Sequence, residues 1–174
     1  ISFISVVTKL PGRFRLNYFF QSFSLSALAM NPLLDFTGLP RFMDIKPEHV
    51  LPAIETLLQQ CRSVADQART AATATWNSFI QPLVDANERL SRAWGQVSHL
   101  NSVMNSPELR EVYNANLPKV TQYFAELSQD QSLFEKFKQL RNSPEFNDLS
   151  NARKKIIENQ LRDFRLGGAE LTTD

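Results

Sequence analysis

Apolar residues recur every three or four positions through most of the chain from residue 47 onward. This spacing places them along one side of an α-helix, which has about 3.6 residues per turn. It predicts helices over residues 47–71, 76–103, 107–129 and 149–166, with a shorter helix between the last two. The expected apolar sides are, in chain order, Val50, Leu51, Ile54, Leu57, Leu58, Cys61, Val64, Ala65 and Ala68; Phe79, Leu83, Ala86, Leu90, Trp94, Val97 and Leu100; Leu109, Val112, Tyr113, Leu117, Val120, Phe124 and Leu127; Leu133, Phe134, Phe137 and Leu140; Ala152, Ile156, Leu161 and Phe164.

Residues that favour helix starts and stops occur at the expected boundaries. Pro47 suits a first helical turn, and Thr75 or Asn77 can cap the second helix. Ser106-Pro107-Glu108 combines a capping hydroxyl, a first-turn proline and an acid that faces the helix dipole. Gly167-Gly168 closes the last helix.

Three prolines and one glycine fall inside the expected helices. The regular part of the first helix is expected to begin only at Pro52, and kinks are expected at Pro82, Gly95 and Pro118. Nowhere after residue 46 does an alternating strand pattern compete with the helical spacing. The predicted fold class is all-α.

The first 29 residues differ in charge from the rest of the chain. Residues 1–34 contain three basic side chains and no acidic one, and the stretch before Met30 ends in Ala27-Leu28-Ala29. Basic residues, an apolar stretch and a small-x-small ending are typical of a secretory signal, and the missing acids also suit an organelle transit peptide. Gln21 and three serines interrupt the apolar stretch. We therefore expect Met30 to be the natural start.

This interpretation divides the chain into four segments. Residues 1–29 are an extension without a family counterpart, whether upstream translated sequence, a vector remnant or a targeting segment. Residues 30–46 form an extended lead-in with Pro32, Gly38 and Pro40, residues 47–168 the helical domain, and residues 169–174 a truncated linker. Side chains of the extension, including Phe14, Phe19, Phe20 and Phe23, are expected to stay outside the core.

Composition narrows the class of protein. The chain has 174 residues, 43% of them hydrophobic, which is enough for one domain with a core. A net charge of +1 gives no global attraction for nucleic acid or an anionic membrane. No run of 18 apolar residues is present, so no transmembrane helix is expected. A single cysteine, Cys61, excludes an internal disulfide and fits the cytoplasm.

Candidate metal ligands and nucleophiles are few. A catalytic zinc needs three protein ligands, and the chain offers only His49, His99 and the Cys61 thiol, on separate helices and without a His-Glu-x-x-His spacing. A zinc site built from these three is the weaker interpretation. We expect His49 to be an exposed or capping side chain, His99 a hydrogen-bonded residue near a helix end, and Cys61 a buried, inert thiol.

Charged side chains are more easily explained as surface. The basic run Arg153-Lys154-Lys155 is expected to form helical charge pairs with Glu158 and Asp163 rather than a nucleic-acid site. Carboxylates that fall on expected solvated helix faces, rather than in an acid–base pair, are Asp85, Glu88, Glu108, Glu111, Glu126 and Asp130.

Several short segments resemble one known family along residues 31–168. The most specific is Val97-Ser98-His99-Leu100-Asn101-Ser102-Val103 followed by Asn105-Ser106-Pro107-Glu108-Leu109-Arg110. Others are Asn31-Pro32-Leu33-Leu34, Leu39-Pro40-Arg41-Phe42, Pro47-Glu48-His49-Val50 with Pro52-Ala53, Trp76-Asn77 with Pro82-Leu83, and Leu161-Arg162-Asp163-Phe164. Together they resemble the start of the thimet oligopeptidase-like zinc peptidases.

The resemblance implies a parent enzyme much longer than this chain. Such enzymes are helical, with two lobes around a deep channel that admits short peptides, and their zinc lies in the carboxy-terminal half. This chain would be the amino-terminal lobe of a cytoplasmic zinc metalloendopeptidase, walling the channel and packing on the missing catalytic lobe. No catalytic, cofactor-binding or metal-binding residue is carried over to it, so the chain alone is expected to be inactive. The alternative is a free-standing, non-catalytic helical interaction module.

Overall fold

Nine helical elements follow one another through residues 31–170, the part of the chain that the computed structural model describes. Two 3-10 turns, Pro32–Leu34 and Phe42–Asp44, precede the long helices. The α-helices are α2 (Pro47–Thr70), α3 (Gln81–Val103), α4 (Pro107–Ser128), α5 (Gln131–Arg141), α6 (Pro144–Asp148) and α7 (Asn151–Leu166), and a π-helical turn, Trp76–Ile80, leads into α3. Within these residues no strand is formed, so the predicted all-α class is confirmed. The expected behaviour of residues 1–29, including their four phenylalanines, lies outside the described residues.

The helix starts agree with the capping residues read from the sequence. Pro47 occupies the first turn of α2, and the Oγ of Ser106 accepts a hydrogen bond from the Leu109 amide at 3.2 Å. Thr75, rather than Asn77, caps the second helical segment, because its Oγ1 accepts from the Ser78 amide at 3.0 Å.

Three local features differ from the prediction. Helix α2 continues through Pro52 instead of starting there. The irregularity expected at Pro82 lies just before it, as the π-helical turn in which the Gln81 amide donates to the Trp76 carbonyl. The five-residue helix α6 was not predicted, although Ser143-Pro144-Glu145 repeats the start signal seen at Ser106.

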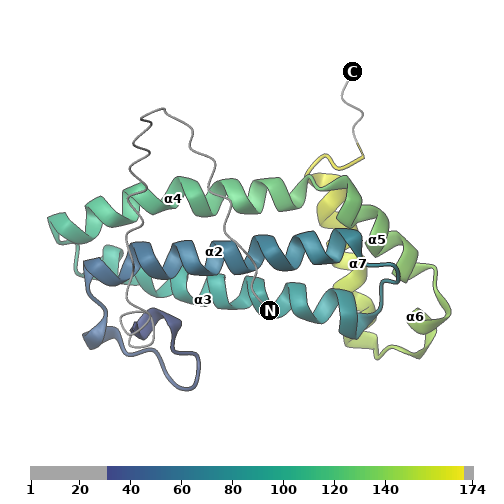
Figure 1. Ribbon diagram of the computed structural model, residues 1–174, viewed down its shortest axis with the longest axis horizontal. Coiled ribbons are helices and arrows are strands. Elements are labelled where there is room, and N and C mark those ends of the chain that lie inside the picture. Colours follow the sequence, from purple (N-terminus) through teal and green to yellow (C-terminus); the bar gives the residue numbers. More distant parts are fainter. Residues whose placement is uncertain (1–30, 171–174) are drawn as a thin grey trace, which may run out of the picture.

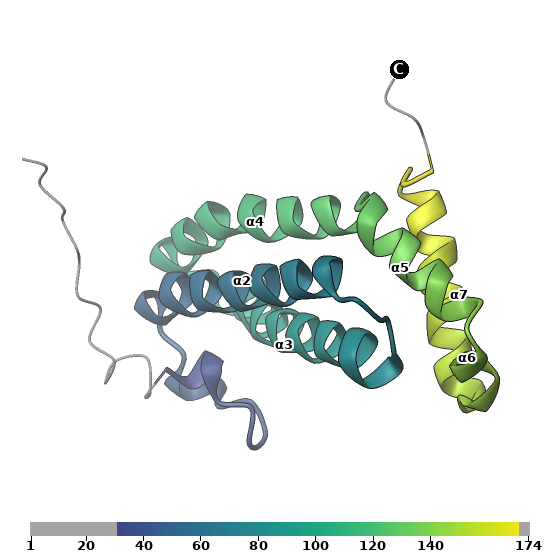
Figure 2. The same cartoon turned by 45° about the vertical axis from the view of Figure 1, so that its right-hand side comes forward.

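Helices α2, α3 and α4 lie side by side and form the long part of the molecule (Figures 1 and 2). Between them is the aliphatic cluster, which also takes Leu33 from the lead-in. Its buried members are Leu33, Val50, Ala53, Ile54, Leu57, Leu58, Cys61, Leu90, Ala93, Val97, Leu109, Val120 and Tyr123.

Helices α5, α6 and α7 gather at one end of the long helices, where α2 ends and α3 begins (Figure 1). They bury the aromatic cluster against the end of α2 and the start of α3. Its buried members are Ala65, Ala68, Trp76, Phe79, Ile80, Leu83, Leu133, Phe134, Phe137, Leu140, Phe146, Leu149, Ile157, Leu161, Phe164 and Ala169. Ring centroids of Phe79 and Phe137 lie 4.9 Å apart, and those of Phe137 and Phe164 lie 5.4 Å apart. Leu127 of α4 packs against both clusters.

Most of the expected apolar positions are confirmed, but single positions on α7, α4 and α2 are wrong. On α7, Ile157 is buried and Ala152 and Ile156 are exposed, because Ile157 lies four residues before Leu161 and seven before Phe164. On α4, Asn116 is buried in place of the expected Leu117, which is 38% exposed. Leu51 of α2 also faces outward.

The end of α7 passes close to the end of α4 at Gly167. A Cβ atom at this position would lie 2.7 Å from the Ser128 carbonyl oxygen, and the φ of Gly167 is an ordinary −75°. Space, rather than backbone conformation, therefore requires glycine here. Gly168 is different, since its φ of 91° is in the left-handed region.

Candidate functional site

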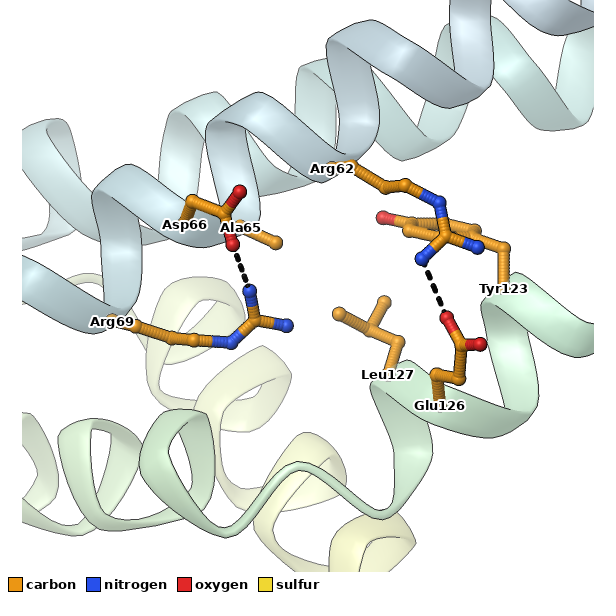
Figure 3. A pocket seen from close by; sticks show the side chains of 7 residues that line it. All are labelled: Arg62, Ala65, Asp66, Arg69, Tyr123, Glu126 and Leu127. Atoms are coloured by element: carbon orange, nitrogen blue, oxygen red, sulfur yellow. Dashed lines mark hydrogen bonds and ion pairs between the residues drawn. The ribbon is translucent and has the colours of Figure 1, made fainter.

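A small polar pocket of about 110 Å³ lies between α2 and α4, close to the start of α5. Arg62, Asp66 and Arg69 reach it from α2, because spacings of four and three residues put them on one side of the helix. Tyr123, Glu126 and Leu127 reach it from α4, and Ala65 of α2 completes the lining. Figure 3 shows Leu127 between the two arginines.

Each arginine of the pocket is already paired. Arg62 Nη1 lies 2.6 Å from Glu126 Oε2, and Arg69 Nε lies 2.6 Å from Asp130 Oδ2. Arg69 also forms an ion pair with Asp66 (Figure 3). The pocket therefore offers no free guanidinium to an anionic ligand.

Hydrogen bonds and neighbouring charges shift the pKa values of two of these side chains, Glu126 and Arg69. The hydrogen bonds from Arg62 and Gln122 hold the pKa of Glu126 below its usual value. Burial acts to lower the pKa of Arg69, but its hydrogen bond to Asp130 and the charges of Asp130 and Asp66 together raise it. Asp130 also accepts from the Leu133 amide at 2.9 Å, so it caps α5 while it holds α2.

The two groups beside the pocket that could act as nucleophiles are both kept protonated. Burial raises the pKa of the Cys61 thiol, whose Sγ donates to the Ala86 carbonyl at 3.3 Å. Burial, with the neighbouring Cys61, also raises the pKa of Tyr123, whose hydroxyl donates to Asn87 Oδ1 at 2.7 Å. The thiolate that cysteine chemistry requires is therefore disfavoured at neutral pH.

The three side chains considered as zinc ligands have separate roles. His49 caps the start of α2, where its Nδ1 accepts from the Lys46 amide at 3.1 Å. His99 is exposed, and its ring forms a tilted pair with the Phe42 ring, with centroids 5.3 Å apart. Among the residues that the structure describes, its side chain does not form the expected hydrogen bond. Cys61 is buried in the aliphatic cluster, as expected. Within residues 31–170 no three histidine, cysteine or carboxylate side chains come together as metal ligands, so this donor set does not fit zinc.

The other charged candidates are placed largely as surface residues. Asp85, Glu88, Glu108, Glu111 and Glu126 are exposed. Asp130 is the exception, because only 10% of its side chain is exposed in its pair with Arg69.

The basic run on α7 forms other contacts than the predicted charge pairs. Arg153 lies over the Trp76 ring at 4.7 Å, and Lys154 Nζ donates to the Asn147 carbonyl at 2.7 Å. The two acids expected to balance the run bind elsewhere, Glu158 to Arg141 at 3.7 Å and Asp163 to Arg162 at 2.9 Å.

The fold and the pocket define an all-helical domain in which ion pairs join α2 to α4 and to the start of α5. A family model described as "Neurolysin/Thimet oligopeptidase, N-terminal domain" matches residues 54–174. The chain belongs to this family.

Curated relatives carry related names. The chain is 50% identical over 144 residues to "Oligopeptidase A" of Haemophilus influenzae, an alignment that covers 83% of this chain and 21% of the relative. It is 42% identical over 142 residues to "Oligopeptidase A" of Escherichia coli, covering 81% and 21%. It is 32% identical over 144 residues to "Organellar oligopeptidase A, chloroplastic/mitochondrial" of Arabidopsis thaliana, covering 83% and 18%. The chain thus spans about a fifth of the length of these relatives.

Proposed function

We propose that this chain is the amino-terminal part of a cytoplasmic zinc peptidase that hydrolyses short oligopeptides, and that it forms one wall of the substrate channel. The observation that carries the proposal is the 50% identity to a protein named oligopeptidase A, extending over 144 of the 174 residues. At this level of identity we expect the two proteins to share the helical fold over the aligned residues.

The division of labour within such a peptidase follows from the donor set of this chain. His49, His99 and Cys61 are engaged in a cap, a ring contact and a core. This supports the proposal that the zinc ligands lie in the polypeptide beyond the matched segment. The residues described here would contribute shape and rigidity. Arg62–Glu126 and Arg69–Asp130 fix the spacing of α2 from α4 and α5, which a channel wall needs if it is to exclude folded substrates.

A cytoplasmic location is part of the proposal. One relative, 34% identical over 151 residues, is named "Probable cytosolic oligopeptidase A".

The test is a peptidase assay on two proteins. One is the 174-residue chain; the other is the same chain joined to the part of the Haemophilus influenzae relative that lies beyond the matched segment. Both are incubated with zinc and a quenched short peptide, with and without chelator. Cleavage that is chelator-sensitive and confined to the joined protein is expected. Cleavage by the 174-residue chain would contradict the proposal, and a joined protein that folds but remains inactive would favour a non-catalytic interaction module.

A further inference from the structure

An apolar groove of about 260 Å³ opens between α3 and α7, on a different side of Leu127 from the polar pocket. Leu83 and Val84 of α3 line one wall, and Ile156 and Phe164 of α7 line the other. Phe137 of α5, a member of the aromatic cluster, also lines the groove. Polar side chains, including Glu88 and Gln160, stand among these apolar residues.

Two aliphatic side chains in this groove remain without full cover. Val84 is 43% exposed and Ile156 is 44% exposed, although each belongs to a helix that buries other apolar residues nearby. Apolar side chains that converge on a concave surface with polar neighbours are typical of a docking site. Helices pack by placing ridges of side chains into the grooves of their neighbours, so a groove between two helices can receive the apolar side of a third.

We propose that this groove is the docking site for an amphipathic helix from the polypeptide that follows the matched region in full-length members of the family. The proposal rests on the proposed function insofar as both require a longer parent protein. Its occupant would bring aliphatic side chains to Val84 and Ile156 and polar side chains to Glu88 and Gln160.

The position of the groove favours this occupant over a second copy of the chain. The family description places the domain at the amino terminus, and the matched segment is only 21% of the Haemophilus influenzae relative. Most of such a protein therefore follows α7, the helix that forms one wall of the groove. A segment attached this close has a high effective concentration at the groove, which a separate molecule lacks.

Thiol labelling tests the proposal directly. Ile156→Cys is introduced into the 174-residue chain and into the joined protein described above, and the rate of reaction with a soluble thiol reagent is measured. Native Cys61 is 1% exposed and serves as the slow background. Val103→Cys, at a residue 60% exposed near the far end of α3, is the matched control.

Protection at residue 156 is the expected result. The Ile156→Cys thiol should react on the order of tenfold or more slowly in the joined protein, because labelling there awaits local opening of the docked helix. The Val103→Cys thiol should react alike in both proteins. Equal labelling rates at residue 156 in the two proteins would overturn the proposal. Protection of residue 156 in the 174-residue chain that disappears on dilution would also overturn it, because a second copy of the chain would then be the occupant.

A second measurement needs only the 174-residue chain. An apolar dye such as ANS should bind it, and the pair Val84→Ser and Ile156→Ser should remove most of the fluorescence, whereas Leu117→Ser on α4 should not. Dye fluorescence that the pair leaves unchanged would overturn the groove as an apolar docking surface. Peptidase activity of the joined protein is recorded in parallel. Protection without activity would reject the proposed function alone, and activity without protection would reject only the docking site.

Discussion

The two clusters of this domain reach stability by different means. In the aliphatic cluster, mostly aliphatic side chains are buried between three long helices, and α2, α3 and α4 are each at least 22 residues long. In the aromatic cluster, α5 to α7 have 11, 5 and 16 residues. Large rings compensate for short helices there, together with cations over those rings, such as Arg141 at 4.1 Å from the Phe146 centroid. The comparison teaches that helix length and side-chain size can substitute for one another in a core.

The largest effect is expected from removing a ring at the centre of the aromatic cluster. Phe164 is 1% exposed and contacts Phe134 and Phe137, so Phe164→Ala should cost about 3–5 kcal/mol of unfolding free energy. Urea unfolding measures the loss, and hydrogen exchange should locate it in α5–α7. The matched control, Leu90→Ala, removes a fully buried side chain from the aliphatic cluster and should raise exchange mainly in α2–α4. Identical exchange patterns for the two variants would contradict the division into two clusters.

A smaller effect is expected where charge joins the two regions. Arg69→Met leaves the Asp130 carboxylate, only 10% exposed, without its cation, and should cost about 1–3 kcal/mol. Arg62→Met is the control, because its partner Glu126 is 43% exposed and such a pair contributes about 0.2–1 kcal/mol. Chemical denaturation of both variants measures the difference. Equal losses would mean that burial of Asp130 does not strengthen the contact between α2 and α5.

The smallest effect is a pH dependence confined to the long-helix region. The folded pKa of Glu126 is lower than its unfolded value, near 4.5, because Arg62 and Gln122 donate to the carboxylate. The stabilisation is therefore fully present above the unfolded pKa and is lost as pH falls through the folded pKa. With the side chain 43% exposed, the contribution should stay below about 1 kcal/mol. Glu126→Gln should flatten the stability profile below pH 4.5, and an unchanged acid limb would show that the pair contributes nothing.

Helical spacing predicted the long helices well because each carries its apolar side over many turns, which averages out single exceptions. It failed where two apolar residues are adjacent, as at Ile156 and Ile157, since one residue of register decides which is buried. It also predicted that Leu117 is buried on α4, whereas the buried residue is its neighbour Asn116. Asn116 is polar, and its Oδ1 has no hydrogen-bond partner within residues 31–170, so a search for apolar spacing passes over it.

The polar pocket could not be predicted from the sequence in the same way. Arg62, Asp66 and Arg69 stand at helical spacing, so their shared side of α2 was readable. Their partners, Glu126 and Asp130, are about sixty residues away, and only the packing of α2 against α4 and α5 brings them close. Asp130 was expected among solvated acids because its sequence neighbours are polar.

Leu127 is a wall shared by the polar pocket and the apolar groove. Its side chain lines the polar pocket and also the apolar groove, and it packs against both clusters. If filling the groove restricts the rotamers of Leu127, the side-chain entropy of Leu127 is lost at that step. The polar pocket can then tighten around the same side chain without a second loss of that entropy. By thermodynamic reciprocity, tightening of the pocket then favours occupation of the groove by the same factor. Under that condition a single leucine couples the two surfaces without any movement of the backbone.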